Sequence, residues 1–175
     1  MLSLITAVVL GLMAGPTSPV TWALVAILVA IPVIHRKLTA KHYIEWKDEY
    51  SVGLDSIDQQ HRKLVNLINQ LTTSVDYSTG EEFEREALAE LVDYTKTHCT
   101  YEEGLMEDNG YPDFEAHRAQ HKAMIAEVEA VLAEYEKDHD TAMQHACDYL
   151  QVWLIKHING TDKQYSSFLT GKGVN

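Results

Sequence analysis

Four separated stretches of the sequence carry side chains that commonly bind metal ions. They are His61, then His98 and Glu102 in H-C-T-Y-E, then His117 and His121 in H-R-A-Q-H, and finally His157 and Asp162 in H-I-N-G-T-D. Imidazole nitrogens and carboxylate oxygens are ligands for iron and zinc. Each stretch alone is weak evidence, because a chain with nine histidines often shows a histidine pair four residues apart by chance. The four stretches predict a metal site only if the fold brings them together.

The segments that contain these residues have apolar side chains at three- and four-residue steps, which is typical of amphipathic helices. We expect helices over about 56–74, from 79 to 109, from 112 to 137, and from 140 onwards. Strand signals are absent. The sequence therefore predicts an all-α protein in which residues 56–170 form an antiparallel, up-down four-helix bundle.

Several residues predict where these helices begin and end. Thr79 and Glu82 have the spacing of a capping box at the start of the second helix. Gly110 suits a left-handed turn at the end of that helix. Pro112 can occupy the first position of the third helix, where no backbone hydrogen bond is lost.

The candidate ligands lie on the apolar stripes of these helices. His61, for example, is four residues after Ile57 and three before Leu64. An unpartnered polar group in a bundle core costs several kcal/mol, so metal ions are the simplest partners for so many inward-facing nitrogens and oxygens. The remaining histidines lack partners at ligand spacing. We expect His35 at a membrane interface and the other three to be solvated or to cap helices: His42, His139 and His145.

Five imidazoles and two carboxylates are too many ligands for one ion but suit two. Two six-coordinate ions, a geometry common for iron, have about twelve positions in all. The histidines, two bridging carboxylates and one solvent-derived bridge fill all but one. A single vacancy beside a metal pair admits a small diatomic molecule.

This arrangement resembles the hemerythrin family, specifically the bacterial hemerythrins. The resemblance extends from Trp46 to Phe168. It also includes S-V-G-L-D at 51–55, I-D-Q-Q-H at 57–61, G-Y-P at 110–112 and W-L-I-K-H-I at 153–158.

The resemblance implies a non-haem di-iron centre whose two irons share an oxo or hydroxo bridge. Glu102 and Asp162 would bridge the irons as well. One iron would take His117, His121 and His157, while the other would take His61 and His98 and keep the vacancy. The implied function is reversible O2 binding for storage or delivery rather than catalysis. Two alternatives remain: an oxygen or redox sensor, and a di-iron redox enzyme that handles peroxide or NO.

The vacancy needs apolar walls, because water or protons that reach bound O2 would expel it. Leu64, Trp153, Leu154 and Ile158 flank the ligands and are expected to form this wall, although plain core packing explains them equally well. Cys99 departs from the family, which usually has an aromatic or other apolar residue there. It is either a small buried hydrophobe or a residue that enlarges the pocket, speeds autoxidation or senses redox state.

His157 and Asp162 are five residues apart, and on a regular α-helix such side chains point about 140° away from each other. They cannot share a metal pair without a distortion of the helix. The Asn159-Gly160 pair between them therefore predicts a π-type turn, a feature that occurs at functional sites.

The first 34 residues contain no charged side chain and are broken at Gly15-Pro16 and Pro19. We expect residues 1–37 to anchor the protein in membrane lipid, either as a helical hairpin that turns at G-P-T-S-P or as one span from about Thr17 to Lys37. Residues 38–55 would form a linker and arm. The basic residues that follow the apolar run place the bundle on the cytoplasmic side of the inner membrane.

An anchored O2 carrier would lie beside an oxygen-consuming membrane enzyme, and its membrane segment could join copies of the chain. The net charge of −12 belongs entirely to the part after the apolar segment. Such a surface repels phosphate backbones, which argues against nucleic acid as a partner. The two cysteines, Cys99 and Cys147, are most simply free thiols.

Overall fold

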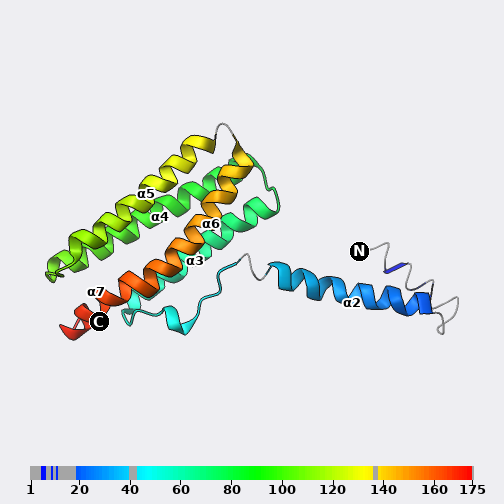
Figure 1. The fold of residues 1–175 in the computed structure, drawn as a ribbon, viewed down its shortest axis with the longest axis horizontal. Helices are drawn as coiled ribbons and strands as arrows, with labels where there is room; N and C mark the ends of the chain where they lie inside the picture. Colours follow the sequence, from blue (N-terminus) through cyan, green and yellow to red (C-terminus); the bar gives the residue numbers. More distant parts are fainter. Residues whose placement is uncertain are drawn as a thin grey trace. The chain divides into compact units, whose positions relative to one another are not determined.

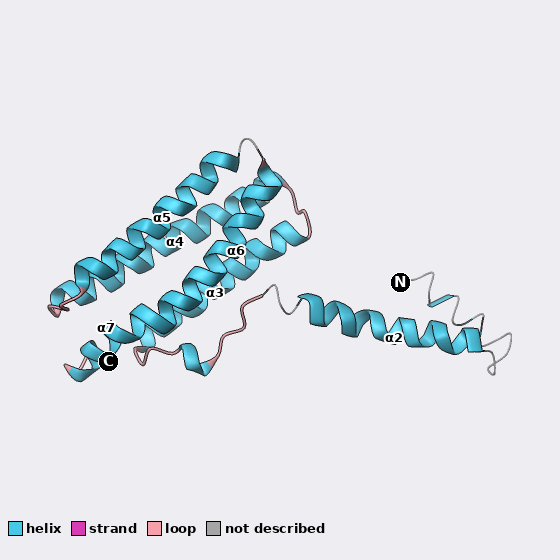
Figure 2. Ribbon diagram, in the orientation of Figure 1, coloured by secondary structure: helices cyan, strands magenta, loops and turns pink. Residues whose placement is uncertain are grey.

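The computed structural model describes residues 5–6, 9, 11, 19–39, 43–135 and 138–174. Within these residues all regular structure is helical (Figure 2). The chain divides into two compact units, residues 1–43 and residues 44–175. The predicted metal ligands all lie in the second unit.

The first unit contains one long helix, α2 (Pro19–Thr39). No helix in the described ranges is long and apolar enough to cross a membrane. The predicted single span is therefore not supported. Within α2, the apolar run from Pro19 ends at Ile34, before Arg36 and Lys37, and is shorter than the roughly 20 residues that a span needs. The alternative hairpin turn lies outside the described residues, as does His42.

An arm leads into the bundle and is tied to its first helix. The Ile44 amide donates to Asn69 Oδ1 at 2.9 Å, and Asn69 Nδ2 donates to the Ile44 carbonyl at 2.8 Å. A short 3-10 turn, η1 (Asp48–Tyr50), follows. The carboxylate of Asp58 then accepts hydrogen bonds from the Ser51 hydroxyl and the Val52 amide. These contacts fix the start of the helix that carries His61.

The second unit is a four-helix bundle (Figure 1). Its helices are α3 (Asp55–Asp76), α4 (Glu81–Asp108), α5 (Phe114–Tyr135) and α6 (His139–His157). Consecutive helices pack against each other, and α3 also packs against α6, which closes the ring. α6 continues through η2 (Ile158–Asp162) into α7 (Lys163–Gly171). The predicted all-helical bundle is confirmed.

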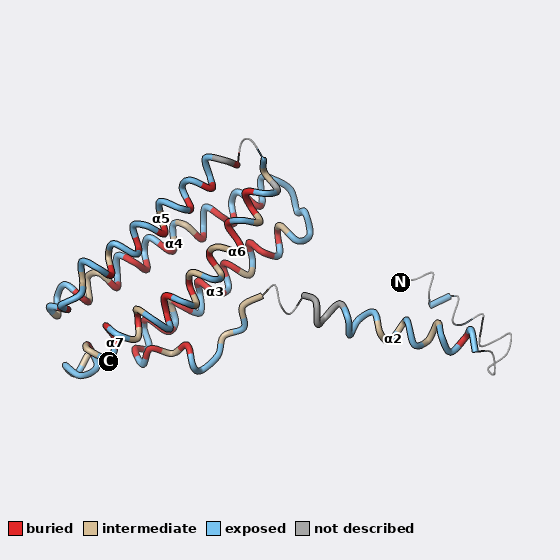
Figure 3. Tube along the Cα trace, viewed as in Figure 1, coloured by how far each residue is buried: buried red, intermediate tan, exposed pale blue. Residues whose placement is uncertain are grey.

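Buried positions recur along one side of each bundle helix (Figure 3). The core contains large apolar side chains from all four helices and from α7, including Ile57, Leu71, Leu91, Met124, Met143 and Leu169. Burial of such side chains contributes about 1.5–3 kcal/mol each. This apolar core extends beyond the predicted ligands and holds their helices in register.

The helix ends agree with the sequence in one case and differ in two. Gly110 has φ of 65°, the left-handed conformation expected after α4. The capping box at Thr79 was a wrong prediction, because Gly80 occupies the N-cap and the Thr79 hydroxyl donates to the Ser74 carbonyl. Pro112 does not open the third helix either; it lies in a turn, and α5 begins at Phe114.

Candidate metal centre

The link between α6 and α7 is the π-helical turn that the sequence predicted. The turn η2 covers I-N-G-T-D at 158–162, and the Lys163 amide donates to the Ile158 carbonyl, five residues earlier. The wider turn rotates Asp162 towards His157, so that His157 Nε2 lies 3.0 Å from Asp162 Oδ1. The Asn159-Gly160 distortion thus brings the two side chains together.

The other predicted ligands come from the same end of the bundle. His61 lies near the start of α3 and His98 and Glu102 near the end of α4, while His117 and His121 lie near the start of α5. In an up-down bundle these helix ends are adjacent. All seven ligand residues are buried, with at most 5% of any residue exposed.

Glu102 and Asp162 each direct their two oxygens at different histidines. Glu102 Oε1 lies 3.6 Å from His61 Nε2 and 3.4 Å from His98 Nε2. Its other oxygen, Oε2, lies 3.7 Å from His117 Nε2 and 3.4 Å from His121 Nε2.

Asp162 repeats this division. Its Oδ2 lies 3.3 Å from His61 Nε2, whereas Oδ1 lies 3.7 Å from His117 Nε2 and 3.0 Å from His157 Nε2. The seven residues therefore surround two positions that share both carboxylates. We call them the three-histidine position (His117, His121, His157) and the two-histidine position (His61, His98).

The donor set fits two cations. Several buried atoms that point into the centre have no hydrogen-bond partner: His61 Nε2, Glu102 Oε2 and both oxygens of Asp162. The Nε2 atoms of His117 and His157 also lie 3.1 and 3.0 Å from His121 Nε2. Orphaned atoms cost free energy, and a cation at each position would satisfy them. Two ligand groups of this kind occur in the described residues, one at each position, and Glu102 belongs to both.

Charge compensation is already present without a cation. Burial by itself raises the pKa of the Glu102 carboxyl, but the surrounding histidines hold it well below the usual range. Burial likewise opposes the protonation of His61, but Asp162 and Glu102 raise its pKa to about 9. Burial lowers the pKa of His98 to about 4. Protons and cations therefore compete for the same Nε2 atoms.

Three polar side chains that support the ligands were missed by the sequence reasoning. Gln60 Oε1 lies 3.0 Å from His98 Nδ1, and Glu103 Oε1 lies 3.0 Å from His121 Nδ1. Tyr165, which is fully buried on α7, donates its hydroxyl to Glu102 Oε1 at 2.5 Å. Gln60 and Glu103 directly precede or follow a ligand in the chain. Tyr165 is three residues after Asp162, on the same helix face, and this spacing was the available signal.

An apolar cavity of about 10 Å³ adjoins the centre, which is about the room that one water-sized molecule needs. Three of the four predicted wall residues line it, namely Leu64, Trp153 and Leu154, and Cys99 lines it as well. Ile158 is fully buried in η2 but does not line it. Three of the candidate ligands also line the cavity, namely His98, His121 and His157. Apolar side chains from α3, α4, α5 and α6 complete it.

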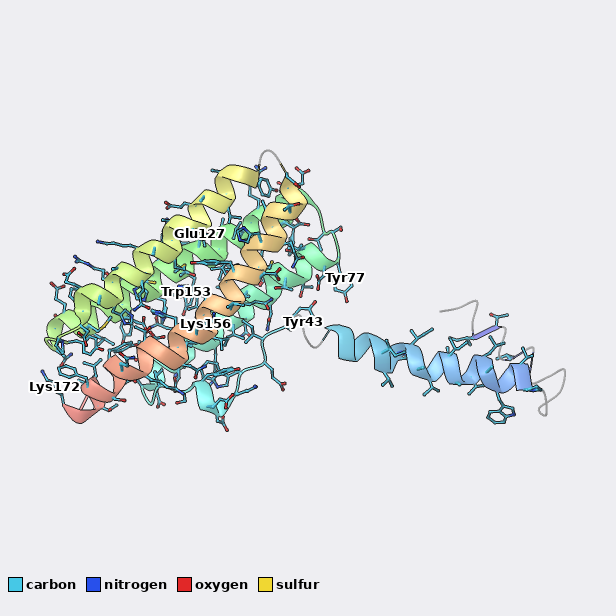
Figure 4. The ribbon with its side chains drawn as sticks, in the orientation of Figure 1. Tyr43, Tyr77, Glu127, Trp153, Lys156 and Lys172 are labelled. Carbon is cyan, nitrogen blue, oxygen red and sulfur yellow. The ribbon has the colours of Figure 1, made fainter. Side chains whose placement is uncertain are left out.

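Trp153 connects this cavity to the ligands. Trp153 is on α6 (Figure 4). Its ring stacks on the imidazole of His157, with ring centroids 4.3 Å apart and planes inclined by 17°. Cys99 and His121 line the same cavity, and burial raises the pKa of the Cys99 thiol. The second cysteine, Cys147, is buried in the core away from the centre.

Two other histidines of the second unit, His139 and His145, lie away from the centre. His145 is exposed, as expected for a solvated residue. His139 is not simply solvated, because its Nε2 lies 3.0 Å from Glu84 Oε2 and its ring contacts Tyr135 edge-on. The side chain of His35 lies outside the described residues.

Comparisons with known proteins agree with this geometry. Residues 52–169 match the family model of the hemerythrin HHE cation binding domain, and the chain therefore belongs to the hemerythrin family. It is 35% identical to a bacteriohemerythrin of Stenotrophomonas maltophilia over 69% of this chain and 78% of that protein. For a bacteriohemerythrin of Clostridium acetobutylicum, the identity is 31% over 69% and 96% of the two chains.

A solved structure gives the same result. A crystal structure of wild-type hemerythrin superposes with a TM-score of 0.58 and 27% identity, over 71% of this chain and 95% of that one. Residues 1–51 of the present chain lie outside the family match.

Proposed function

We propose that this protein binds O2 reversibly at a pair of iron ions and that it is a carrier rather than an enzyme. One observation supports this most strongly: seven buried ligands divide into two sets that share both carboxylates, with one histidine fewer at the two-histidine position. A cation held there would have one histidine ligand fewer than its neighbour, which would leave room for a small ligand. Ferrous iron, when bound, supplies the electrons that O2 accepts on binding.

The side chains of the chain itself control what reaches that position. His61 and His98 would hold the iron with the vacancy, while Glu102 and Asp162 would bridge it to the three-histidine position. Leu64, Trp153 and Leu154 line an apolar cavity with room for a small molecule and would exclude water and protons.

A carrier is favoured over an enzyme by the character of the cavity wall. Its titratable lining groups are ligand histidines and Cys99. A di-iron oxidase would be expected to use mostly carboxylate ligands, whereas five neutral imidazoles stabilise highly oxidised iron less.

Repeated oxygenation tests this proposal. The iron-loaded, reduced protein is expected to gain an optical spectrum on exposure to O2, lose it on degassing and regain it over many cycles. Loss of the spectrum within one or two cycles, with release of ferric iron, would instead indicate an irreversible di-iron enzyme.

We also propose that the N-terminal unit attaches the carrier to the cytoplasmic face of the inner membrane, near an oxygen-consuming enzyme. The support is the set of large apolar side chains that α2 exposes, among them Val20, Trp22, Val29 and Val33, since such surfaces commonly mark interaction sites. Deletion of residues 1–42 should move the protein from the membrane fraction to the soluble fraction and leave its iron content unchanged. An unchanged distribution would contradict attachment through this unit.

A further inference from the structure

The contacts behind the ligands differ between the two cation positions. At the three-histidine position, Nδ1 of His121 lies 3.0 Å from a carboxylate oxygen of Glu103. At the two-histidine position, Nδ1 of His98 lies at the same distance from the amide oxygen of Gln60. The two contacts have the same length, but the acceptor is a carboxylate in one and a neutral amide in the other.

Each contact acts on the metal through a ligand. With Nε2 directed at the centre, the Nδ1 atom of each imidazole carries the proton and donates it in the hydrogen bond. The Glu103 side chain is 25% exposed, so water can stabilise its charged form. A carboxylate acceptor makes the ligating nitrogen a stronger donor, and a neutral amide does so much less. The three-histidine position therefore receives more electron density.

The bridging carboxylate of Glu102 is polarised in the same direction. Tyr165 donates its hydroxyl to Oε1, the oxygen that faces His61 and His98. Oε2, which faces the three-histidine position, has no hydrogen-bond partner. A hydrogen bond withdraws density from the oxygen that accepts it, so the donation of Glu102 to the two-histidine position is weakened.

We propose that Glu103, Gln60 and Tyr165 are positioning residues that make the two irons electronically unequal. Because of them, the three-histidine iron gives up its electron at the lower potential, and the two-histidine iron remains the poorer donor. This inference rests on the proposed function, since it takes iron as the resident metal. It deepens that function, because weak donation at the position with the vacancy favours release of O2.

Charge-exchange variants test the inference by potentiometric titration of the reduced, iron-loaded protein, with ferricyanide accepting one electron from one ferrous ion. Glu103→Gln keeps the hydrogen bond to His121 but removes the charge. We expect the equilibrium constant for the first oxidation to fall about tenfold, which is about 59 mV towards positive potential for one electron. Gln60→Glu adds charge behind His98 and should lower the potential of the two-histidine iron.

The double variant Gln60→Glu/Glu103→Gln is the matched control, because it keeps the net charge and both hydrogen bonds. It should reverse the order of oxidation, so that the half-oxidised protein gives an electron paramagnetic resonance spectrum different from that of the unaltered chain. Tyr165→Phe should lower the potential of the two-histidine iron, because Oε1 regains its donating strength.

Iron content is measured on every variant, so that failures of the two proposals can be told apart. Absence of iron from the unaltered chain overturns the proposed function and this inference together. Two irons per chain, with less than about a twofold change in the oxidation constant of Glu103→Gln and an unchanged spectrum in the double variant, overturn this inference alone. A merely structural role for Glu103 predicts that second result, because the hydrogen bond is retained.

Discussion

The bundle pairs histidine and carboxylate side chains at both of its ends, but only one end has the character of a metal centre. At the end where α3 runs into α4, Oε2 of the buried Glu84 lies 3.0 Å from Nε2 of the half-buried His139. At the opposite end, contacts of similar length leave buried oxygens of Glu102 and Asp162 without partners. Among the residues that the structure describes, groups of three or more ligands occur only there. A metal site is thus marked by converging orphaned atoms, not by a histidine–carboxylate contact alone.

The largest expected effect comes from removing the carboxylate that both positions share. Glu102→Ala should release both cations, since Glu102 belongs to both ligand groups, and metal per chain should fall from about two to below about 0.2. Elemental analysis of the purified protein measures this. Glu84→Ala is the matched control and should keep two metals per chain; equal metal loss in the two variants would contradict the distinction between the ends.

The Glu84–His139 pair should affect stability and not metal binding. His139→Ala removes the partner of a carboxylate whose side chain is only 5% exposed, which costs about 2 kcal/mol of unfolding free energy. Urea unfolding of the chain without metal measures this cost. The metal content of the variant should remain at the level of the unaltered protein. A lower metal content would contradict the prediction, because it would show that this pair affects metal binding at the opposite end.

Removal of metal should make the stability of the folded chain depend on pH through the ligand histidines. The folded-state pKa of His61 is raised to about 9, so the folded chain without metal binds more protons than the unfolded chain between pH 6.5 and 9. This contribution to stability is fully present below pH 6.5 and is lost as the pH rises through 9. His121, whose pKa is raised to about 11, loses part of its contribution over the same range, so the melting temperature without metal should fall by at least about 4 °C from pH 7 to pH 9.

The metal-loaded chain should lack this decrease, because a cation and not a proton occupies His61 Nε2. An equal fall in melting temperature with pH for the loaded and the metal-free protein would contradict this prediction, because it would mean that His61 binds the same protons in both forms.

The smallest effect is expected at the two buried cysteines. Burial raises the pKa of Cys99, and that of Cys147 to about 11, so both remain thiols near neutral pH and react slowly. Cys99→Leu should therefore leave the autoxidation rate unchanged within about twofold, as should Cys147→Ala, a control away from the cavity. Markedly slower autoxidation in Cys99→Leu alone would show that this thiol takes part in the loss of bound O2.

The sequence was most informative where a spacing has a single geometric solution. A spacing of five residues from His157 to Asp162 requires a wider turn if both face one site, and the predicted π-helical turn is present. The apolar periodicity likewise predicted all four bundle helices, because each must bury one face. Gly110 was predictable since only glycine adopts its φ of 65° without strain.

Other features depend on contacts between segments that are separate in the chain, and local spacing does not show which residues will meet. Gln60 on α3 supports His98 on α4, and Tyr165 on α7 donates to Glu102 on α4. The expected cap at Thr79 failed because its hydroxyl found the Ser74 carbonyl instead. The expectation that His139 is solvated or caps a helix was wrong, because Asp138 is the N-cap of α6 and Glu84, more than 50 residues away in the chain, faces His139.

Elemental analysis of the full chain, purified without O2 and without chelators, is the most direct test of the central claim that seven side chains hold two irons. The expected result is about two irons per chain, lost in Glu102→Ala and kept in Glu84→Ala. One iron or none in the unaltered protein, or zinc in place of iron, would contradict it.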